Sequence, residues 1–293
     1  MDTPSDNVIP PSARFYVSSN YILPADDDER IRLNTQHGMM KAAFENRLVL
    51  APVILKPGDR VLDSGTGAAS WLLDFANEVP STVSIYGVDI SSRLFPSDPP
   101  SNIQFLAGSI TQLPENWTST FALVNQRLLF AGLSATAWQA AFSEMYRVLE
   151  PGGWVNLCEL NCDVDYLDFE YGPAVKKTMI LVREIFRSAN VLADAVYHLA
   201  GWLEQAGFTN IHTEMRRIPL NGDEGRPMRE NSCSVYVAMK TPAMKAGGFG
   251  LVQSEAEYDD LVQAYGEEVA VTDNAALLNY TISAQKPSSS SRL

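Results

Sequence analysis

Between residues 59 and 159, short runs of apolar and β-branched residues alternate with longer stretches in which apolar residues recur every three or four positions. This alternation is typical of βαβ units and predicts a mostly parallel sheet covered by helices. One helix is expected around Trp71 and Phe75 and another around Trp138 and Met145, each with one apolar face for the sheet. The expected strands are residues 60–63, 83–89, 103–107, 121–125 and 154–159.

Beyond residue 160 the pattern predicts more helices and two more strands. An apolar stripe at helical spacing runs along residues 173–189, through Val175, Met179, Val182 and Phe186. We interpret this stripe mainly as core, and an apolar pocket between it and Met39, Met40 and Phe44 is the alternative. Residues 221–250 have a mixed pattern that assigns no element. Further helices are expected at 28–50, 195–206 and 254–269, and strands at 209–219 and 277–285.

Composition narrows the functions that this chain can have. Its 293 residues, 46% of them hydrophobic, suffice for one large α/β domain. A formal net charge of -13 would repel a phosphate backbone, so we expect no nucleic-acid partner. Because the start lacks a secretory signal pattern and no apolar run is long enough for a bilayer, we expect a cytoplasmic protein without membrane attachment.

The three cysteines argue against a metal centre. Cys158, Cys162 and Cys233 form no CxxC pair and are too sparse for a disulfide scaffold. We expect buried free thiols and no bound metal.

A glycine turn at residues 61–67, with the sequence VLDSGTG, follows the first predicted strand and precedes a helix. Small residues let the backbone approach a ligand closely, and free N–H groups at a helix start attract a carboxylate or phosphate. A nucleotide-like cofactor is therefore expected. The turn alone leaves NAD open, because Asp89 ends the second strand, although Ser70 replaces the third glycine of the GxGxxG fingerprint.

Three motifs in order resemble the class I S-adenosylmethionine-dependent methyltransferases. Residues 61–67 resemble motif I of that superfamily, including the acidic Asp63 before the glycines. Asp89 matches its second-strand acid, and residues 147–154, RVLEPGGW, look like its approach to strand five. These motifs favour S-adenosylmethionine over NAD as the cofactor.

The resemblance extends to the fungal methyltransferases of secondary metabolism. It is carried by YILP at residues 21–24 with Glu29, by Arg32 and Leu33, by Gln36 and His37, by the NQR sequence at residues 125–127, and by PGGWV at residues 151–155 with Glu159. This resemblance implies a Rossmann-like α/β fold whose seven-stranded sheet is mostly parallel with an antiparallel last strand. It also implies helical lid elements, before the first strand and after the fifth, over the acceptor.

We accordingly expect a single methyltransferase domain at residues 18–287. It would carry an N-terminal helical cap at 18–56 and a lid insertion at 164–192. Residues 1–17 and 288–293 have the composition of poorly ordered ends.

By the same resemblance, Gly65 and Gly67 pass the methionine end of the cofactor, Asp63 holds its amino group, and Asp89 accepts hydrogen bonds from its ribose. Asp63 could instead be a turn carboxylate, and Asp89 a solvated strand-end acid. The expected cofactor-binding set is Tyr21, Asp63, Ser64, Gly65, Thr66, Gly67, Asp89, Ile90, Ser109, Ile110, Asn125 and Gln126.

Five further residues of that set have distinct expected roles. Ser109 and Ile110 would face the adenine, with a serine where the superfamily often has an acid. Asn125 and Gln126 would lie on the sulfonium side, with loop hydrogen bonding as the alternative. Tyr21 could cover the cationic sulfur with its ring, or simply anchor the N-terminal arm.

Two residues are candidates for catalysis. His37 could act as a general base, because an imidazole can accept a proton near neutral pH, or it could be an ordinary core or surface histidine. Glu159, at the end of the fifth strand, could orient a hydroxyl or pair with an amine of the acceptor, or serve the fold alone.

The expected reaction is direct displacement of the cofactor's methyl group by a small-molecule acceptor, without a covalent enzyme intermediate. Oxygen is the favoured acceptor atom and nitrogen the second. An Asn-Pro-Pro-Tyr signature of base methylation is absent, since Gln126 and Arg127 follow Asn125. Two other readings stay open: a methyltransferase-fold regulator or non-methylating catalyst, and a nicotinamide oxidoreductase. The oligomeric state, monomer or homodimer, is undetermined.

Overall fold

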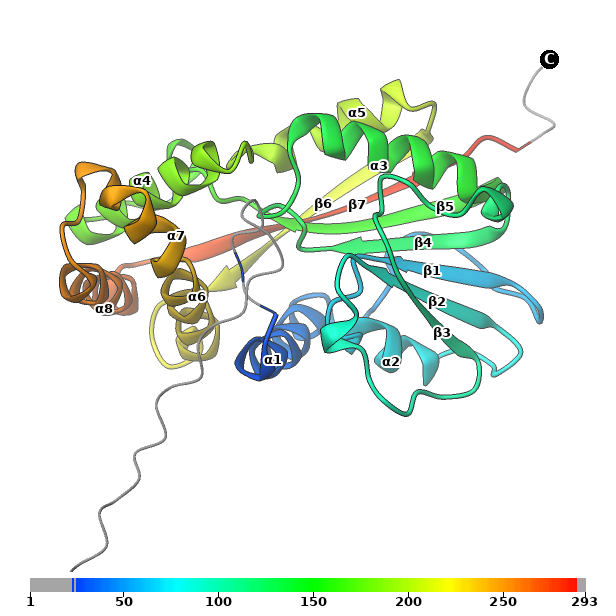
Figure 1. The fold of residues 1–293 in the computed structure, drawn as a ribbon, viewed down its shortest axis with the longest axis horizontal. Coiled ribbons are helices and arrows are strands. Elements are labelled where there is room, and N and C mark those ends of the chain that lie inside the picture. The colour runs from blue at the N-terminus through cyan, green and yellow to red at the C-terminus, as the bar shows by residue number, and fades with distance from the viewer. Residues whose placement is uncertain (1–22, 24, 289–293) are drawn as a thin grey trace, which may run out of the picture.

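A seven-stranded sheet organises the molecule in this computed structural model, which describes residues 23 and 25–288 (Figure 1). Its strand order is β3-β2-β1-β4-β5-β7-β6, and β7 runs antiparallel to both of its neighbours while the other pairs are parallel. The predicted Rossmann-like sheet is confirmed. The strands are β1 (Arg60–Ser64), β2 (Ser84–Asp89), β3 (Ile103–Ala107), β4 (Phe121–Arg127), β5 (Leu149–Leu160), β6 (Thr209–Pro219) and β7 (Ala276–Gln285).

Helices cover both faces of the sheet (Figure 1). On one face lie α3 (Ala135–Val148) and α5 (Leu199–Gln205), whose apolar sides pack on a core that includes Trp138 and Phe142. The other face is covered by α2 (Ser70–Ala76), where Trp71 stacks on Phe75 with ring centroids 4.6 Å apart. Each helix therefore presents the apolar face that its spacing predicts.

A helical cap lies at one end of the sheet (Figure 1). It consists of α1 (Asp27–Ala43), α4 (Pro173–Ser188), α6 (Arg226–Ala238), α7 (Lys240–Lys245) and α8 (Glu255–Val271), and its buried side chains form one apolar cluster. The stripe on α4 belongs to this cluster, which also contains Met40 and Phe44, so it is core.

The cap is larger than the sequence predicts. Besides the expected segments at 18–56 and 164–192, it includes three helices inserted between β6 and β7. Pro227 lies in the first turn of α6 and Pro242 in that of α7, and Gly247 and Gly248 adopt left-handed backbone angles, so the stretch to which the sequence assigns no element contains two helices followed by a glycine-rich turn.

Candidate functional site

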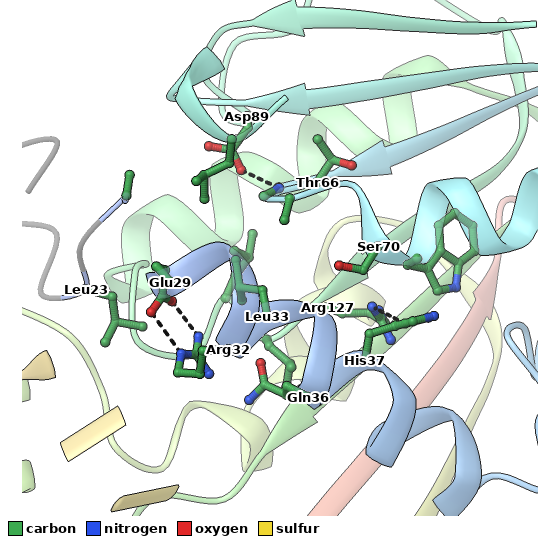
Figure 2. A pocket seen from close by; sticks show the side chains of 18 of the residues that line it. Leu23, Glu29, Arg32, Leu33, Gln36, His37, Thr66, Ser70, Asp89 and Arg127 are labelled. Carbon is green, nitrogen blue, oxygen red and sulfur yellow. Dashed lines mark hydrogen bonds and ion pairs between the residues drawn. The ribbon is translucent and has the colours of Figure 1, made fainter. Parts of the chain in front are cut away.

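A cavity opens at the carboxyl ends of β1, β2 and β4, beneath α1. Figure 2 shows Thr66 and Asp89 on one side of it and Glu29, Arg32 and Gln36 of α1 on the other. Ligands of open parallel sheets bind outside the carboxyl ends of the strands, where neighbouring connections lead to opposite faces. The cavity therefore lies where the motif-bearing loops meet the cap.

The glycine turn after β1 forms one wall of the cavity. Gly65 and Gly67 have φ angles of 76° and 54°, a region that favours glycine. A Cβ on Gly65 would come within 2.6 Å of Leu129, and one on Gly67 within 3.5 Å of Leu33. Both glycines therefore keep the backbone close to the cavity without a side chain filling it.

The amide groups of this turn are already engaged. The N–H groups of Gly65 and Thr66 both donate to the carbonyl oxygen of Val88, at 2.8 and 2.9 Å. The N–H of Gly67 donates to Asp89 Oδ2 at 2.8 Å. These three N–H groups are therefore not free to bind an anion, because they donate to acceptors of Val88 and Asp89 in β2.

Asp63 lines the cavity and is almost fully buried. Its carboxylate accepts hydrogen bonds from the Thr66 hydroxyl at 2.6 Å and from Asn125 Nδ2 at 2.8 Å. Burial raises the pKa of Asp63, and these two hydrogen bonds act in the opposite direction. Asn156 Nδ2 donates in turn to Asn125 Oδ1 at 2.9 Å. This chain of amides fixes the carboxylate at the end of β1.

Asn125 and Gln126 do not line the cavity with their side chains. Successive strand residues point to opposite faces, so Asn125 supports Asp63 while Gln126 lies on the face of α3. There Gln126 Oε1 accepts from the Ser64 hydroxyl at 3.2 Å, and its Nε2 has no partner among the described atoms. In this structure the side chains of Ser64, Asn125 and Gln126 support the strand ends, and their expected place in the cofactor site stays a prediction.

Asp89 ends β2 and faces the cavity (Figure 2). Its Oδ1 accepts from the N–H of Ser91 at 3.1 Å, and its Oδ2 from Gly67. Burial raises the pKa of Asp89, and the backbone donors oppose this effect. Since each carboxylate oxygen has two lone pairs, Asp89 can still accept hydrogen bonds from a ligand hydroxyl. Ile90, beside it, also lines the cavity.

Ser109 and Ile110 lie away from the cavity. The Ser109 hydroxyl pairs with that of Thr111 at 2.7 Å and accepts from the Thr111 N–H. Ile110 packs in the core beneath α3. The loop after β3 thus turns toward α3, and Ser91 and Leu94 line the cavity on this side. The expected contact of Ser109 and Ile110 with the adenine stays a prediction.

His37 lies between two charged partners and is not a free base. Arg127 Nη2 donates to His37 Nδ1 at 3.1 Å, and His37 Nε2 is 3.0 Å from Asp74 Oδ2. Because a guanidinium only donates, Nδ1 must accept, and Nε2 carries the proton toward Asp74. Burial, together with the charge of Arg127, lowers the pKa of His37. The imidazole is therefore neutral and fixed by both nitrogens.

Glu159 is nearly fully buried behind the cavity wall. Its two oxygens accept from the N–H groups of Leu129 and Phe130, at 3.1 and 3.0 Å. Burial raises its pKa to about 8, although those donors favour the charged form. These contacts favour the alternative that Glu159 serves the fold, because they support the loop after β4, which lines the cavity.

Three polar residues of α1 complete the cavity, and the family resemblance assigns them no role. Arg32 and Glu29 form a bidentate pair with contacts of 2.5 and 2.9 Å, and both are largely buried. Gln36 is 5% exposed and makes no side-chain hydrogen bond with another described residue. Their signal in the sequence is the spacing of Glu29, Arg32 and Gln36, which places three polar side chains on one helical face.

Some expectations concern features outside this geometry. Tyr21 lies outside the described residues. In the part of the chain that is described, His, Cys, Asp and Glu side chains form no group that could hold a metal ion. Every helix among residues 25–288 is too short or too polar to span a bilayer.

Comparisons with known proteins agree with the motifs. A family model described as a methyltransferase domain matches residues 61–153. N-methyltransferase sirN of Leptosphaeria maculans is 35% identical over 210 residues, covering 70% of this chain and 73% of that protein. N-methyltransferase tcpN of Claviceps purpurea is 33% identical over 259 residues, covering 84% and 90%.

A solved structure shares the fold. Phosphoethanolamine N-methyltransferase 2 of Haemonchus contortus, in complex with phosphomonomethylethanolamine and S-adenosylhomocysteine, aligns with a TM-score of 0.50 and 17% sequence identity. The match covers 92% of this chain and 55% of that chain, so this protein spans about half of its length.

Proposed function

Since the chain belongs to the class I S-adenosylmethionine-dependent methyltransferases of fungal secondary-metabolism type, we propose that it methylates a nitrogen atom of a small-molecule acceptor. The two relatives named above are both N-methyltransferases, and this supports nitrogen. The preference for oxygen drawn from the sequence has no support in these relatives. S-adenosylmethionine is the cofactor of this family.

The residues of the cavity fit that cofactor. Gly65 and Gly67 leave room for close approach of its methionine part, and Asp63 presents a buried carboxylate suited to its amino group. Asp89 offers lone pairs for the ribose hydroxyls. Bound there, the cofactor supplies a methyl group on a sulfonium, which a nucleophile can displace directly.

The observation that carries the acceptor proposal is the unpaired amide of Gln36. The Gln36 side chain lines the cavity and makes no hydrogen bond with another described residue, so its amide can donate to and accept from a ligand. The neighbouring Arg32 and Glu29 already neutralise each other. This part of the cavity therefore suits an acceptor that is uncharged where it meets Gln36, and we assign Gln36 the role of orienting it.

The chain contributes alignment and exclusion of water. Helix α1 and the loop from Leu128 to Phe130 close over the cavity, and the backbone of that loop is held by Glu159. The described histidine nearest the site, His37, has both nitrogens engaged. A neutral nitrogen attacks through its lone pair, so its proton can leave to water after transfer and no protein base is needed.

Methyl transfer from labelled cofactor tests this proposal. The purified protein is incubated with methyl-labelled S-adenosylmethionine and a panel of small amides, amines and alcohols, each paired with a version whose nitrogen or oxygen is already methylated. Label on nitrogen, absent with the blocked partners, is the expected result. Label confined to oxygen contradicts the assignment to nitrogen. No transfer to any compound, together with a stable protein partner in pulldown, would favour the regulator reading.

A further inference from the structure

A cation without an anionic partner lies beside the cofactor site. Arg127 ends β4, next to β1, is half-buried and lines the same cavity as Asp63 and Gly65. It forms no ion pair with a carboxylate among the described residues. Arg32, the other arginine that lines the cavity, forms an ion pair with Glu29. Figure 2 shows Arg127 directed at His37, across from the α1 pair.

Leaving such a charge unpaired is costly. A guanidinium has five N–H donors, and in Arg127 one Nη2–H bond goes to a neutral imidazole while the buried Nε has no partner. Burial accordingly lowers the pKa of Arg127, and the carboxylates of Asp63, Glu159 and Asp74 offset this effect only from outside ion-pair distance. The side chain thus has donors and charge that its protein neighbours leave unmatched.

The cofactor brings an anion that needs a partner. Its methionine part carries a carboxylate, and the amides of Gly65, Thr66 and Gly67 are already bonded to β2. A carboxylate is the planar acceptor that a guanidinium matches best. We propose that Arg127 binds the methionine carboxylate of the cofactor, an inference that rests on the cofactor of the family and not on the identity of the acceptor.

His37 and Asp74 position this guanidinium. Asp74 Oδ2 is 3.0 Å from His37 Nε2 and accepts from Lys41 Nζ at 2.7 Å. The relay from Asp74 through His37 fixes the direction of Arg127, and it spans α2, α1 and β4. His37, the sequence candidate for a general base, is thereby a positioning residue.

Pairing also solves an electrostatic problem of the site. A free cation near the sulfonium would repel the charged cofactor. When the carboxylate neutralises Arg127, the sulfonium no longer faces an unpaired positive charge in the cavity wall. The same contact therefore gives affinity and removes the repulsion.

Calorimetry with two ligands tests the proposal without any acceptor. S-adenosylhomocysteine carries the amino-acid part, and 5′-methylthioadenosine lacks it. In the Arg127→Met variant, affinity for S-adenosylhomocysteine should fall by about 30-fold or more, the usual cost of deleting one partner of a buried charge pair. Affinity for 5′-methylthioadenosine should change by less than about twofold, since the removed contact is absent from that complex.

Companion variants separate binding from folding. Arg127→Lys keeps the positive charge but loses the paired N–H donors of the guanidinium, so its affinity for S-adenosylhomocysteine should lie between those of the wild type and Arg127→Met. Arg187→Gln removes an arginine that is 74% exposed and should leave both affinities unchanged. An equal loss for both ligands in Arg127→Met and Arg127→Lys would assign a purely structural role, and unchanged affinity for S-adenosylhomocysteine would overturn the contact. Failure of the wild type to bind either ligand would instead count against the cofactor assignment.

Discussion

The sheet and the cap bury their polar residues in different ways. On the sheet side, Asp63 has its own partners in Thr66 and Asn125, so its carboxylate is held by the protein itself. On the cap side, Gln36 lines the cavity and makes no hydrogen bond with another described residue, and Arg127, at the end of β4, has a buried Nε without a partner. The polar groups of Asp63 on the sheet side are satisfied by the protein, whereas Gln36 on the cap side is available to a ligand. We infer that the sheet binds the cofactor and that the cap contacts the acceptor.

The largest expected effect comes from filling the sheet wall. Gly65→Val should lower affinity for S-adenosylhomocysteine by more than about 100-fold, because the side chain meets Leu129 and the left-handed backbone disfavours a branched residue. Calorimetry measures it. Gly58→Val is the matched control: its φ angle is 92°, yet nothing lies within 4 Å of its Cβ. Equal loss of affinity in both variants would contradict the close approach at Gly65.

The support behind the wall should depend on pH. The pKa of Glu159 is raised from 4.5 to about 8, so the folded protein holds a proton that the unfolded chain releases. Its stabilising contribution is full below pH 4.5 and is lost as pH rises toward 8. The stability of the wild type relative to Glu159→Gln should therefore fall by about 3–4 kcal/mol between pH 5 and 8.

Thermal unfolding of both proteins across that pH range provides the measurement. A constant difference in stability would mean that Glu159 is ionised throughout. In that case the two backbone donors, Leu129 and Phe130, outweigh the effect of burial.

Removing the second acid of the sheet wall should have a smaller effect. Asp89→Ala is expected to lower affinity for S-adenosylhomocysteine about tenfold, because hydrogen bonds to charged groups are worth about 1.5–3 kcal/mol and water replaces part of them. Asp98→Ala, an exposed acid in the following loop, controls for the change in net charge. Wild-type affinity in a folded Asp89→Ala protein would remove Asp89 from the site.

The smallest effect on the cofactor is expected from the cap. Gln36→Leu should leave affinity for S-adenosylhomocysteine within about twofold of the wild type, yet lower kcat/KM for the acceptor found in the labelling screen by about tenfold. A Gln36→Glu variant keeps the shape and adds a charge, so it should also lose acceptor turnover. If Gln36→Leu weakens cofactor binding instead, the division between the two walls fails.

The sequence predicts the sheet side better than the cap. Strands β1, β2 and β4 and the positions of Gly65, Asp63 and Asp89 follow from alternation and motif alone, because a strand buried on both faces has a strong local pattern. The alternation of apolar and polar residues does not show which side chains at the carboxyl end of a central strand point toward the cavity. Asn125 and Gln126 were therefore expected together at the ligand, while the pleat separates them.

The cap depends on contacts between distant segments. Gln36 lines the cavity together with the loop after β4, which is distant from α1 in the sequence. Arg127 contacts His37 of α1 and has no carboxylate partner among the described residues, which the sequence alone does not indicate. The fungal resemblance pointed to both positions without giving a reason for either. Of the three helices between β6 and β7, the sequence predicts α8 at residues 254–269 and assigns no element to the segment of α6 and α7, whose first turns contain Pro227 and Pro242.

Calorimetric titration of the wild-type protein with S-adenosylmethionine and, separately, with NAD asks whether the cavity between sheet and cap is a methyltransferase cofactor site. We expect one binding event per chain for S-adenosylmethionine and none for NAD. Binding of NAD, or no binding of S-adenosylmethionine to the folded protein, would contradict this assignment.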